Sequence, residues 1–319
     1  YLAFFLLATI KLTLLMCTRH YKVIDVNTLP DFLVFCTFFS KIMGAKVILD
    51  MHEIMPEFFM SKYKITGSHW IIGLIKFQEK LCLRYADEII TINSPIANLL
   101  ENRSNQKKKI KVVMNSADEN LFSYGEKSET TGPFIFMYHG TLTHMYGLDI
   151  AISAFNQVKN IMPTAQFWII GDGPERDKLE LLSRKLGITD RIKIHGSIRQ
   201  HDIPGYLAKS SVGVLPTRKD EFLDLSFSNK LPEYILMNRP VIVSRLKTIQ
   251  YYFSENALIF FTPEDVNDLA NCMKKIYDHP QKYQPLVINA KKEYTPIRWL
   301  VMKNRYLDTI NKLIRNLNK

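Results

Sequence analysis

The sequence lacks the features that would tie it to a disulfide-stapled, metal-binding or repetitive protein. Its 319 residues contain only four cysteines, which are widely scattered and form no CxxC pair, so neither a disulfide framework nor a zinc site is supported. There is no Asp-x-Asp, no His-x-His and no other compact cluster of metal ligands, and we find no internal repeat or tract of low complexity. These absences favour an ordinary globular protein of a reducing compartment.

A membrane-spanning start is not supported by the sequence either. The first seventeen residues, YLAFFLLATIKLTLLMC, are interrupted by Lys11, and the apolar run is shorter than the roughly 20 residues that a span needs. The chain has no initiator Met, no basic n-region and no small-residue cleavage site of a secretory signal. We therefore expect a helix that covers a sheet, with one edge free to touch a bilayer.

What the sequence does have is apolar material for two cores and an excess of basic charge. Hydrophobic residues make up 47% of the chain, and its length favours two domains. The formal charge of +11 is partly concentrated in Lys107–Lys109 and in 291–319. An anionic membrane surface or a phosphorylated substrate would suit this charge, whereas the basic residues lack the aromatic platform of single-strand nucleic-acid binders. For Lys107–Lys109 alone, a solvated loop is the simplest interpretation.

Short runs rich in Val and Ile alternate with segments of helical period. We expect strands near residues 23–26, 46–50, 88–92, 111–114, 134–139, 166–171, 192–195, 212–215, 241–243 and 258–261. We expect helices near residues 31–43, 69–86, 95–102, 148–160, 175–186, 202–208, 230–237 and 266–278. This alternation predicts an α/β fold with parallel sheets and helices on both faces.

The chain reads as two tandem doubly wound, Rossmann-like domains. The polar segment 123–133, SYGEKSETTGP, is the expected linker between them. The first domain has only about four expected strands and opens on a helix, whereas a doubly wound half normally begins with a strand and a glycine turn. We therefore expect its N-terminal part to be missing from this sequence.

Unusual residues gather where strands of the second domain should end, the edge at which parallel sheets bind ligands. Three of the segments are HGTLT, GDGPE and HGS, at residues 139–143, 171–175 and 195–197, and the fourth is the loop 224–228. Glycine lets a backbone amide approach a ligand closely, and helix N-termini attract phosphate. Each segment alone is typical of a turn, but four at one sheet edge predict a binding site.

The segment NKLPEYILMNRPVIVS, residues 229–244, contains the most informative pair. Lys230 and Glu233 are three residues apart and share one face at a helix start. Lysine offers a point charge for a diphosphate, and glutamate can accept both hydroxyls of a ribose. A surface ion pair of this spacing would contribute only about 0.3–0.5 kcal/mol. Their position near Gly140 and Gly196 favours a grip on a nucleoside diphosphate.

The run SNKLPEYILMNRPVIVS, with YHGTLTHMYGLDIAISAF and FWIIGDGPERDKLE before it, resembles the nucleotide-sugar-dependent glycosyltransferases of family 4, glycosyl transferases group 1. The runs KVILDMHEIMPEFF, YADEIITINSPIANLL and KIKVVMNSADENLF resemble that family's acceptor-side domain. The resemblance implies the GT-B fold, with two domains facing a cleft, and transfer of a sugar to a hydroxyl acceptor with retention. It implies a truncated acceptor-side domain at 1–122, a linker at 123–133, a donor domain at 134–290, and a C-terminal helix at 291–319 packed back on the first domain.

The resemblance also assigns roles to residues. Glu233 matches the ribose-binding glutamate, and Lys230 lies where the diphosphate is held. The expected donor-binding residues are Gly140, Thr141, Gly171, Gly173, His195, Gly196, Ser197, Asn229, Lys230 and Glu233. The expected acceptor-side residues are Asp50, His52 and Glu53, and the expected catalytic residues are His52, Lys230 and Asp224. We expect no metal and no cofactor beyond the substrate nucleoside-diphosphate sugar.

Three features depart from the family's pattern. The acidic residue expected eight positions before Glu233 is Leu225 here, so we expect the adjacent Asp224 to touch the sugar. The arginine and lysine of the first donor-domain loop appear as Thr141 and Tyr146, which places more of the leaving-group charge on Lys230 and on backbone amides. The N-terminal glycine loop of the family is not in this sequence.

Two other functions fit the same sequence. A nucleotide-sugar epimerase needs acid and base carboxylates, for which Asp50, Glu53 and Asp224 are the candidates. A non-catalytic homologue that binds nucleotide or membrane is favoured by the replacements at Thr141 and Tyr146. Fold alone does not separate these functions. A lipid-linked or polysaccharide acceptor, at the cytoplasmic face of a membrane, suits the basic and partly apolar first domain.

Overall fold

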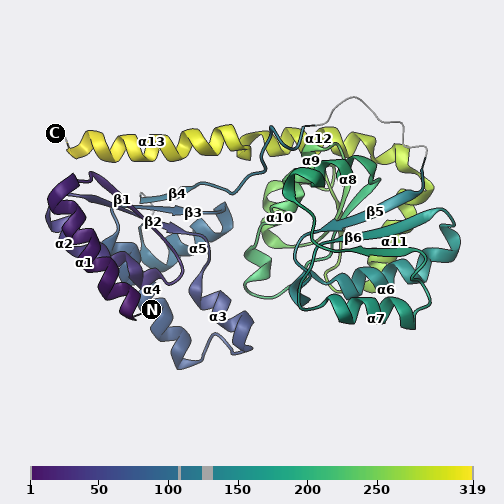
Figure 1. Cartoon of the computed structure of the whole chain (residues 1–319), viewed down its shortest axis with the longest axis horizontal. Coiled ribbons are helices and arrows are strands. Elements are labelled where there is room, and N and C mark those ends of the chain that lie inside the picture. Colours follow the sequence, from purple (N-terminus) through teal and green to yellow (C-terminus); the bar gives the residue numbers. More distant parts are fainter. Residues whose placement is uncertain (1, 107–108, 124–131, 318–319) are drawn as a thin grey trace. The chain divides into compact units, whose positions relative to one another are not determined.

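The computed structural model describes residues 2–106, 109–123 and 132–317. The chain divides into two compact units: residues 1–115 with 300–319, called unit 1, and residues 116–299, called unit 2. Each unit contains a parallel sheet with helices packed around it, as the strand–helix alternation predicts (Figure 1). Most of the expected linker, and Lys107 and Lys108 of the basic run, lie outside the described residues.

Over the described residues, unit 1 has a four-stranded parallel sheet in the order β1-β2-β3-β4. Its strands are β1 (Val23–Asn27), β2 (Lys46–Met51), β3 (Glu88–Thr91) and β4 (Ile110–Val112). Side chains on both faces of the central strands are fully buried, as in Val47 and Ile48 of β2. Near-continuous Val and Ile runs are typical of parallel strands that are covered on both sides.

The helices of unit 1 are α1 (Leu2–Arg19), α2 (Phe38–Ile42), α3 (Met55–Tyr63), α4 (Trp70–Tyr85), α5 (Ser94–Ser104) and α13 (Trp299–Leu317). Helices α2 to α5 lie between its strands in sequence, whereas α1 precedes them and α13 follows unit 2. The single helix expected near 31–43 is wrong, because Asp31–Thr37 forms a 3-10 helix, η1, before α2 begins. The Thr37 hydroxyl donates to the carbonyl of Val34, and such side-chain bonds compete with the α-helical pattern.

Helix α1 differs from the expected sheet-covering helix. It packs against η1 and α2, and Met16 is the one buried residue among those described for it. By length and composition it could cross a membrane, with 18 residues at a mean hydropathy of 1.7, a criterion that a signal sequence near an N-terminus also meets. The helix extends two residues beyond the run considered in the sequence, to Arg19, and meets this criterion with its 18 residues.

Helix α13 covers one face of the sheet of unit 1, and α1, α2 and α4 lie on the other side (Figure 1). Leu313 packs in one cluster with Ile48 of β2 and Ile90 of β3. The hydroxyl of Tyr306 donates to the carboxylate of Asp25 on β1 at 2.7 Å. The helix is therefore held by an apolar seam with polar contacts beside it.

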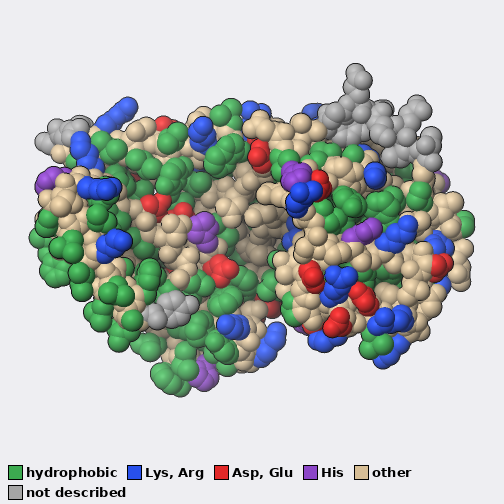
Figure 2. Space-filling view, in the orientation of Figure 1, with side chains coloured by type: hydrophobic (Ala, Val, Ile, Leu, Met, Phe, Trp, Pro, Cys, Tyr) green, Lys and Arg blue, Asp and Glu red, His purple; other side chains and the backbone are tan. Residues whose placement is uncertain are grey.

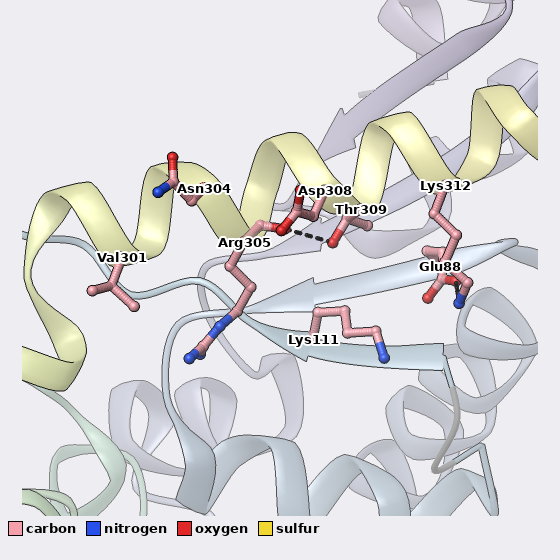
Figure 3. Close-up of a pocket in the computed structure, with 8 residues that line it drawn as sticks. All are labelled: Glu88, Lys111, Val301, Asn304, Arg305, Asp308, Thr309 and Lys312. Carbon is pink, nitrogen blue, oxygen red and sulfur yellow. Dashed lines mark hydrogen bonds and ion pairs between the residues drawn. The ribbon is translucent and has the colours of Figure 1, made fainter.

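A groove of about 500 Å³ runs along α13 beside β3 and β4. Figure 3 shows Lys312 reaching down from α13 to Glu88, and their charged atoms are 3.1 Å apart. The guanidinium of Arg305 donates to the carbonyl of Val112 at 2.7 Å. The groove is lined by both basic and acidic side chains, so its lining does not favour a ligand of one charge over the other.

Over the described residues, unit 2 has a six-stranded parallel sheet in the order β10-β9-β8-β5-β6-β7. Its strands are β5 (Phe134–His139), β6 (Ala165–Ile170), β7 (Ile192–His195), β8 (Val212–Leu215), β9 (Val241–Ser244) and β10 (Ile259–Phe261). The chain builds outward from β5 to β7 and then returns to build from β8 to β10. Strand β5 is therefore at the topological switch point, where ligands bind in doubly wound sheets.

The helices of unit 2 pack around this sheet. They are α6 (Leu148–Val158), α7 (Arg176–Lys185), α8 (Ile203–Lys209), α9 (Lys230–Leu236), α10 (Lys247–Tyr252), α11 (Val266–Asp278) and α12 (Gln284–Tyr294). The bounds of α11 agree with the prediction, because Asp265 caps it by accepting from the amides of Asn267 and Asp268. Helices α10 and α12 were not expected from the sequence.

Candidate functional site

Loops that carry glycine meet at the carboxyl ends of β5, β6 and β7. The amide of Gly140 donates to the carbonyl of Ile170 at 2.8 Å, and that of Gly171 donates to the carbonyl of His195 at 3.2 Å. Gly140 and Gly171 have φ angles of +124° and +138°, and a Cβ on Gly171 would lie 1.9 Å from the Gly140 carbonyl oxygen. These two glycines are required because the loops pack backbone against backbone.

A cavity of about 280 Å³ opens over these loops. It is lined by Phe122, His139, Gly140, Thr141, Ile170, Gly171, Asp172, Ser197, Ile198, Gln200, Ile203 and Glu233. Five of the predicted donor-binding residues therefore line one cavity: Gly140, Thr141, Gly171, Ser197 and Glu233. They come from three strand ends and from α9, which are far apart in the sequence.

Glu233 points toward the buried end of β5. Its carboxylate lies 3.2 Å from Nε2 of His139, the last residue of that strand, which is 5% exposed. The two atoms are close, yet they are not aligned as a hydrogen bond, so Nε2 of His139 has no hydrogen-bond partner among the described residues. A buried polar atom without a partner is costly, and here it lies on the wall of a cavity. This pair therefore offers unsatisfied hydrogen-bonding capacity to a ligand.

Burial shifts the ionisation of this cluster strongly. It lowers the pKa of His139 to about 3, helped by the charge of Lys230, so the imidazole is neutral near neutral pH. Burial raises the pKa of Glu233 to about 7, against the pull of Lys230. Burial also lowers the pKa of Lys230 to about 8, against the pull of Glu233. Such shifts in a cavity are typical of functional sites.

Lys230 lies directly beneath the first glycine loop. A Cβ on Gly140 would lie 2.1 Å from Cε of Lys230, so a glycine is needed at that position. The ammonium is 4.2 Å from the ring centre of Tyr146 and 5.5 Å from that of Tyr138. Among the described residues, no carboxylate lies within ion-pair distance of it. The cation is therefore held by aromatic rings next to a glycine turn.

The other predicted donor-binding residues lie near the cavity but do not line it. Gly173 packs over the backbone of Leu142, and Gly196 lies beside Arg176. The ring of His195 packs edge-on against Trp168, at a centroid distance of 5.6 Å. Asn229 precedes α9, is exposed, and makes no side-chain capping bond.

Asp224 has local partners of its own. Its carboxylate accepts from the amide of Lys247, at the start of α10, at 2.8 Å. It also lies 3.4 Å from the ammonium of Lys219. Asp224 does not line the cavity that contains Glu233, and its contact with a sugar stays a prediction.

The predicted acceptor-side residues gather at the carboxyl edge of the sheet of unit 1. Asp50 is in β2, and His52 and Glu53 follow that strand directly. Nε2 of His52 lies 3.0 Å from Oδ1 of Asn27 and 3.4 Å from the carboxylate of Asp50. The hydrogen bond to Asp50 raises the pKa of His52, and burial raises that of Glu53. Asp25 lies next to this group and its pKa is raised mainly by burial.

Sequence reasoning gave no role to the side chains that support Lys230 and Glu233. It noted His139 only as the first residue of the segment 139–143 and did not consider Tyr138, although both end an otherwise apolar strand, FIFMYH. Tyr146 was considered only as a missing lysine. Its ring contact with Lys230 depends on the packing of η3 (His144–Tyr146) against α9, which no sequence pattern encodes.

The part of the chain that contains this site is similar to known proteins. Residues 133–279, which contain every residue named above as lining the cavity except Phe122, match the family model described as glycosyl transferases group 1. Alpha-D-kanosaminyltransferase of Streptomyces kanamyceticus is 26% identical over 157 residues, 49% of this chain and 39% of that protein. Glycogen synthase of Mycobacterium tuberculosis is 22% identical over 238 residues, 72% of this chain and 56% of that protein.

The chain spans between 39% and 56% of the length of these two curated relatives. It is also similar to solved structures. The crystal structure of Anabaena HepE in complex with UDP superposes with a TM-score of 0.77 at 17% identity, covering 95% of this chain and 82% of that one. Residues 133–279 therefore match the glycosyl transferases group 1 model, and the two parallel sheets of the chain match the fold of GT-B glycosyltransferase structures.

Proposed function

We propose that this protein is a glycosyltransferase, which binds a nucleoside-diphosphate sugar in unit 2 and transfers the sugar to a hydroxyl acceptor in polysaccharide or glycolipid synthesis. The carrying observation is the pair of Glu233 and buried His139 on the wall of a cavity at the switch point of the sheet, with half-buried Lys230 beside it under Gly140. Matches to curated glycosyltransferases and to a UDP-bound structure support the proposal.

The chemistry of the cluster fits a nucleotide diphosphate. The barrier to sugar transfer comes from charge that develops on the sugar and on the departing diphosphate. The ammonium of Lys230 and the amides of Gly140 and Thr141 would stabilise the leaving oxygens, and one such donor contributes about 3–4 kcal/mol in comparable enzymes. The carboxylate of Glu233 would accept the two ribose hydroxyls.

We also propose the finer features that family 4 resemblance implies. Transfer retains the anomeric configuration by attack on the face from which the diphosphate leaves, and it needs no divalent cation. The acceptor side is unit 1, where His52 lies between Asp50 and Asn27. An assay in excess EDTA, with the product's anomeric configuration read by NMR, tests both features at once.

Labelled donors discriminate this function from its alternatives. The full protein is incubated with radiolabelled UDP-, GDP- and ADP-sugars and a mixed pool of lipid-linked and polysaccharide acceptors. Label in an acceptor supports transfer, whereas a new epimer in the nucleotide pool supports the epimerase. Donor binding without either product supports a non-catalytic homologue and would overturn the proposed function.

We further propose that unit 1 docks on the cytoplasmic face of an anionic bilayer. Large apolar side chains are exposed on α1, α2 and α4, among them Leu7, Phe38 and Trp70, and hydrophobic side chains gather over this part of unit 1 in Figure 2. These three helices carry Lys11, Arg19, Lys41, Lys76, Lys80 and Arg84, and their one acidic residue, Glu79, is buried. An apolar surface with only positive exposed charge matches an anionic lipid surface.

Vesicle sedimentation tests this docking. We expect the protein to bind phosphatidylglycerol-containing vesicles and to lose most of that binding when Leu6, Leu7 and Ile10 are replaced by Ser. Replacing the equally apolar but mostly buried Met16 by Leu is the matched control, and it should leave binding unchanged. Equal sedimentation of the triple variant and the wild type would contradict the proposal, as would equal binding to neutral vesicles.

A further inference from the structure

The loop that follows β5 holds Tyr146 in a fixed place. The amide of Arg218 donates to the carbonyl of Met145 at 2.9 Å, and its guanidinium donates to the carbonyl of His144 at 3.1 Å. The same guanidinium contacts the carboxylate of Asp149 at 2.6 Å. Two bonds from Arg218 therefore anchor the short turn that ends in Tyr146, and a third ties Arg218 to the start of α6, so the direction of the ring is set by the fold.

The ring that this turn presents faces the ammonium of Lys230. Nζ of Lys230 lies 4.2 Å from the ring centre of Tyr146, within the range of a strong cation–π contact. Tyr138 lies behind, with its ring centre 6.2 Å from that of Tyr146 and its hydroxyl donating to the carbonyl of Thr141 at 2.9 Å. The groups that face Lys230 are thus Tyr138 and His139 of β5, Tyr146 of η3, and Glu233 of its own helix.

We propose that Tyr146, supported by Tyr138, is a positioning residue that holds Lys230 beneath Gly140 as a full positive charge directed at the donor's diphosphate. This inference rests on the proposed function and deepens it. An aromatic face stabilises an ammonium group without cancelling its charge, whereas a carboxylate partner would neutralise it. The ring therefore keeps the cation available for the ligand while compensating part of the cost of burying it.

The geometry explains why a ring suits this position. Lys230 is half-buried, and burial alone favours its neutral form, which could not stabilise a departing diphosphate. The ring of Tyr146, which belongs to η3, contacts the ammonium of Lys230. Cε of Lys230 fills the space that a side chain at position 140 would need. Loss of the ring would both leave a void beside the ammonium and remove its electrostatic stabilisation.

Two variants of Tyr146 separate the effect of its aromatic face from the effect of its volume. Tyr146→Phe keeps the aromatic face, and Tyr146→Leu keeps much of the volume without it. With UDP, GDP and ADP as probes in calorimetry, we expect Tyr146→Leu to weaken the best-bound nucleotide about 5-fold to 30-fold and Tyr146→Phe to stay within about 2-fold of the wild type. Equal affinity of the wild type and Tyr146→Leu would overturn the inference.

A titration without any ligand tests the same contact independently. In protein with ¹³C-labelled lysine, the Lys230 signal is the one missing from Lys230→Met, and its pKa should fall in Tyr146→Leu and stay unchanged in Tyr146→Phe. Weaker nucleotide binding without a fall in this pKa would also overturn the inference, because the ring would then act through packing alone. If the wild type binds none of the three nucleotides, the proposed function fails, and the titration alone decides whether the ring holds the ammonium.

Discussion

The two units build the same kind of parallel sheet but differ in what they expose. Unit 2 keeps the half-buried charges of Lys230 and Glu233 at the carboxyl edge of its sheet, whereas the buried carboxylate of Glu79 in unit 1 is paired with a basic side chain. Unit 1 exposes apolar groups on its helices, as in Leu7 of α1 and Trp70 of α4. Burying charge and exposing apolar surface both cost stability. This contrast is the basis of the two proposals, a polar ligand in unit 2 and an apolar surface for unit 1.

The largest expected effect is the loss of nucleotide affinity in unit 2 when the Glu233 carboxylate is removed. We expect Glu233→Ala to weaken nucleotide binding by roughly 100-fold, because hydrogen bonds to a charged group contribute about 1.5–3 kcal/mol each. A thermal-shift screen with UDP, GDP and ADP measures it. Glu180→Ala, in the exposed ion pair with Arg176, is the matched control and should leave the shift intact. A preserved shift in Glu233→Ala would remove Glu233 from the site.

The same side chain should destabilise the unliganded protein. The pKa of Glu233 is raised from 4.5 to about 7 by burial, so the folded state binds more protons than the unfolded state between these values. Stability is therefore lost as pH rises from about 4.5 to 7. We expect Glu233→Gln to be about 1–3 kcal/mol more stable than the wild type at pH 8 and equal to it near pH 4.5. Urea unfolding at the two pH values checks this, and a less stable variant at pH 8 contradicts it.

Donor binding should have a narrow pH range. Glu233 must be ionised to accept hydroxyls and Lys230 must be protonated to hold a diphosphate, and burial brings their pKa values to about 7 and about 8. Affinity should fall as pH drops below 7 and again as pH rises above 8, which gives a bell-shaped profile. Calorimetry with the best-bound nucleotide measures the profile. A flat profile between pH 6 and 9 would show that these charges do not face the ligand.

The smallest effects should come from the polar contacts of α13 in unit 1. Lys312→Met leaves the carboxylate of buried Glu88 without its one side-chain partner among the described residues and should cost about 1–3 kcal/mol. Tyr306→Phe removes a single hydrogen bond to Asp25 and should cost about 1 kcal/mol. Lys303→Met, exposed on the same helix, should change stability by no more than about 0.5 kcal/mol. Urea unfolding ranks the three variants, and equal effects would mean that the apolar seam alone holds α13.

Most strands and helices could be predicted from the sequence, because the signals for them lie within short segments. Val and Ile runs predicted the strands of both sheets, and the Asp265 cap fixed the start of α11. Helix α3 was not predicted, although Pro56 near its first residue is typical of a helix start.

The site was predicted only in part because its supporting contacts are between distant segments. Gly140 and Glu233 could be identified, since glycine turns and an acidic helix start leave marks in the sequence. The approach of His139 to Glu233, and the ring of Tyr146 over Lys230, depend on how β5 and η3 pack against α9. No spacing in one segment encodes a partner in another, so these contacts required the structure.

The assignment of residues 300–319 to the same unit as residues 1–115 has a consequence for how the chain is made. During synthesis, all of unit 2 leaves the ribosome before α13 does. One face of the sheet of unit 1 therefore stays uncovered until α13 has been made. A nascent chain stalled before residue 300 should therefore present Ile48 and Ile90 to chaperones. A helix that is translated after the whole of unit 2 thus closes unit 1.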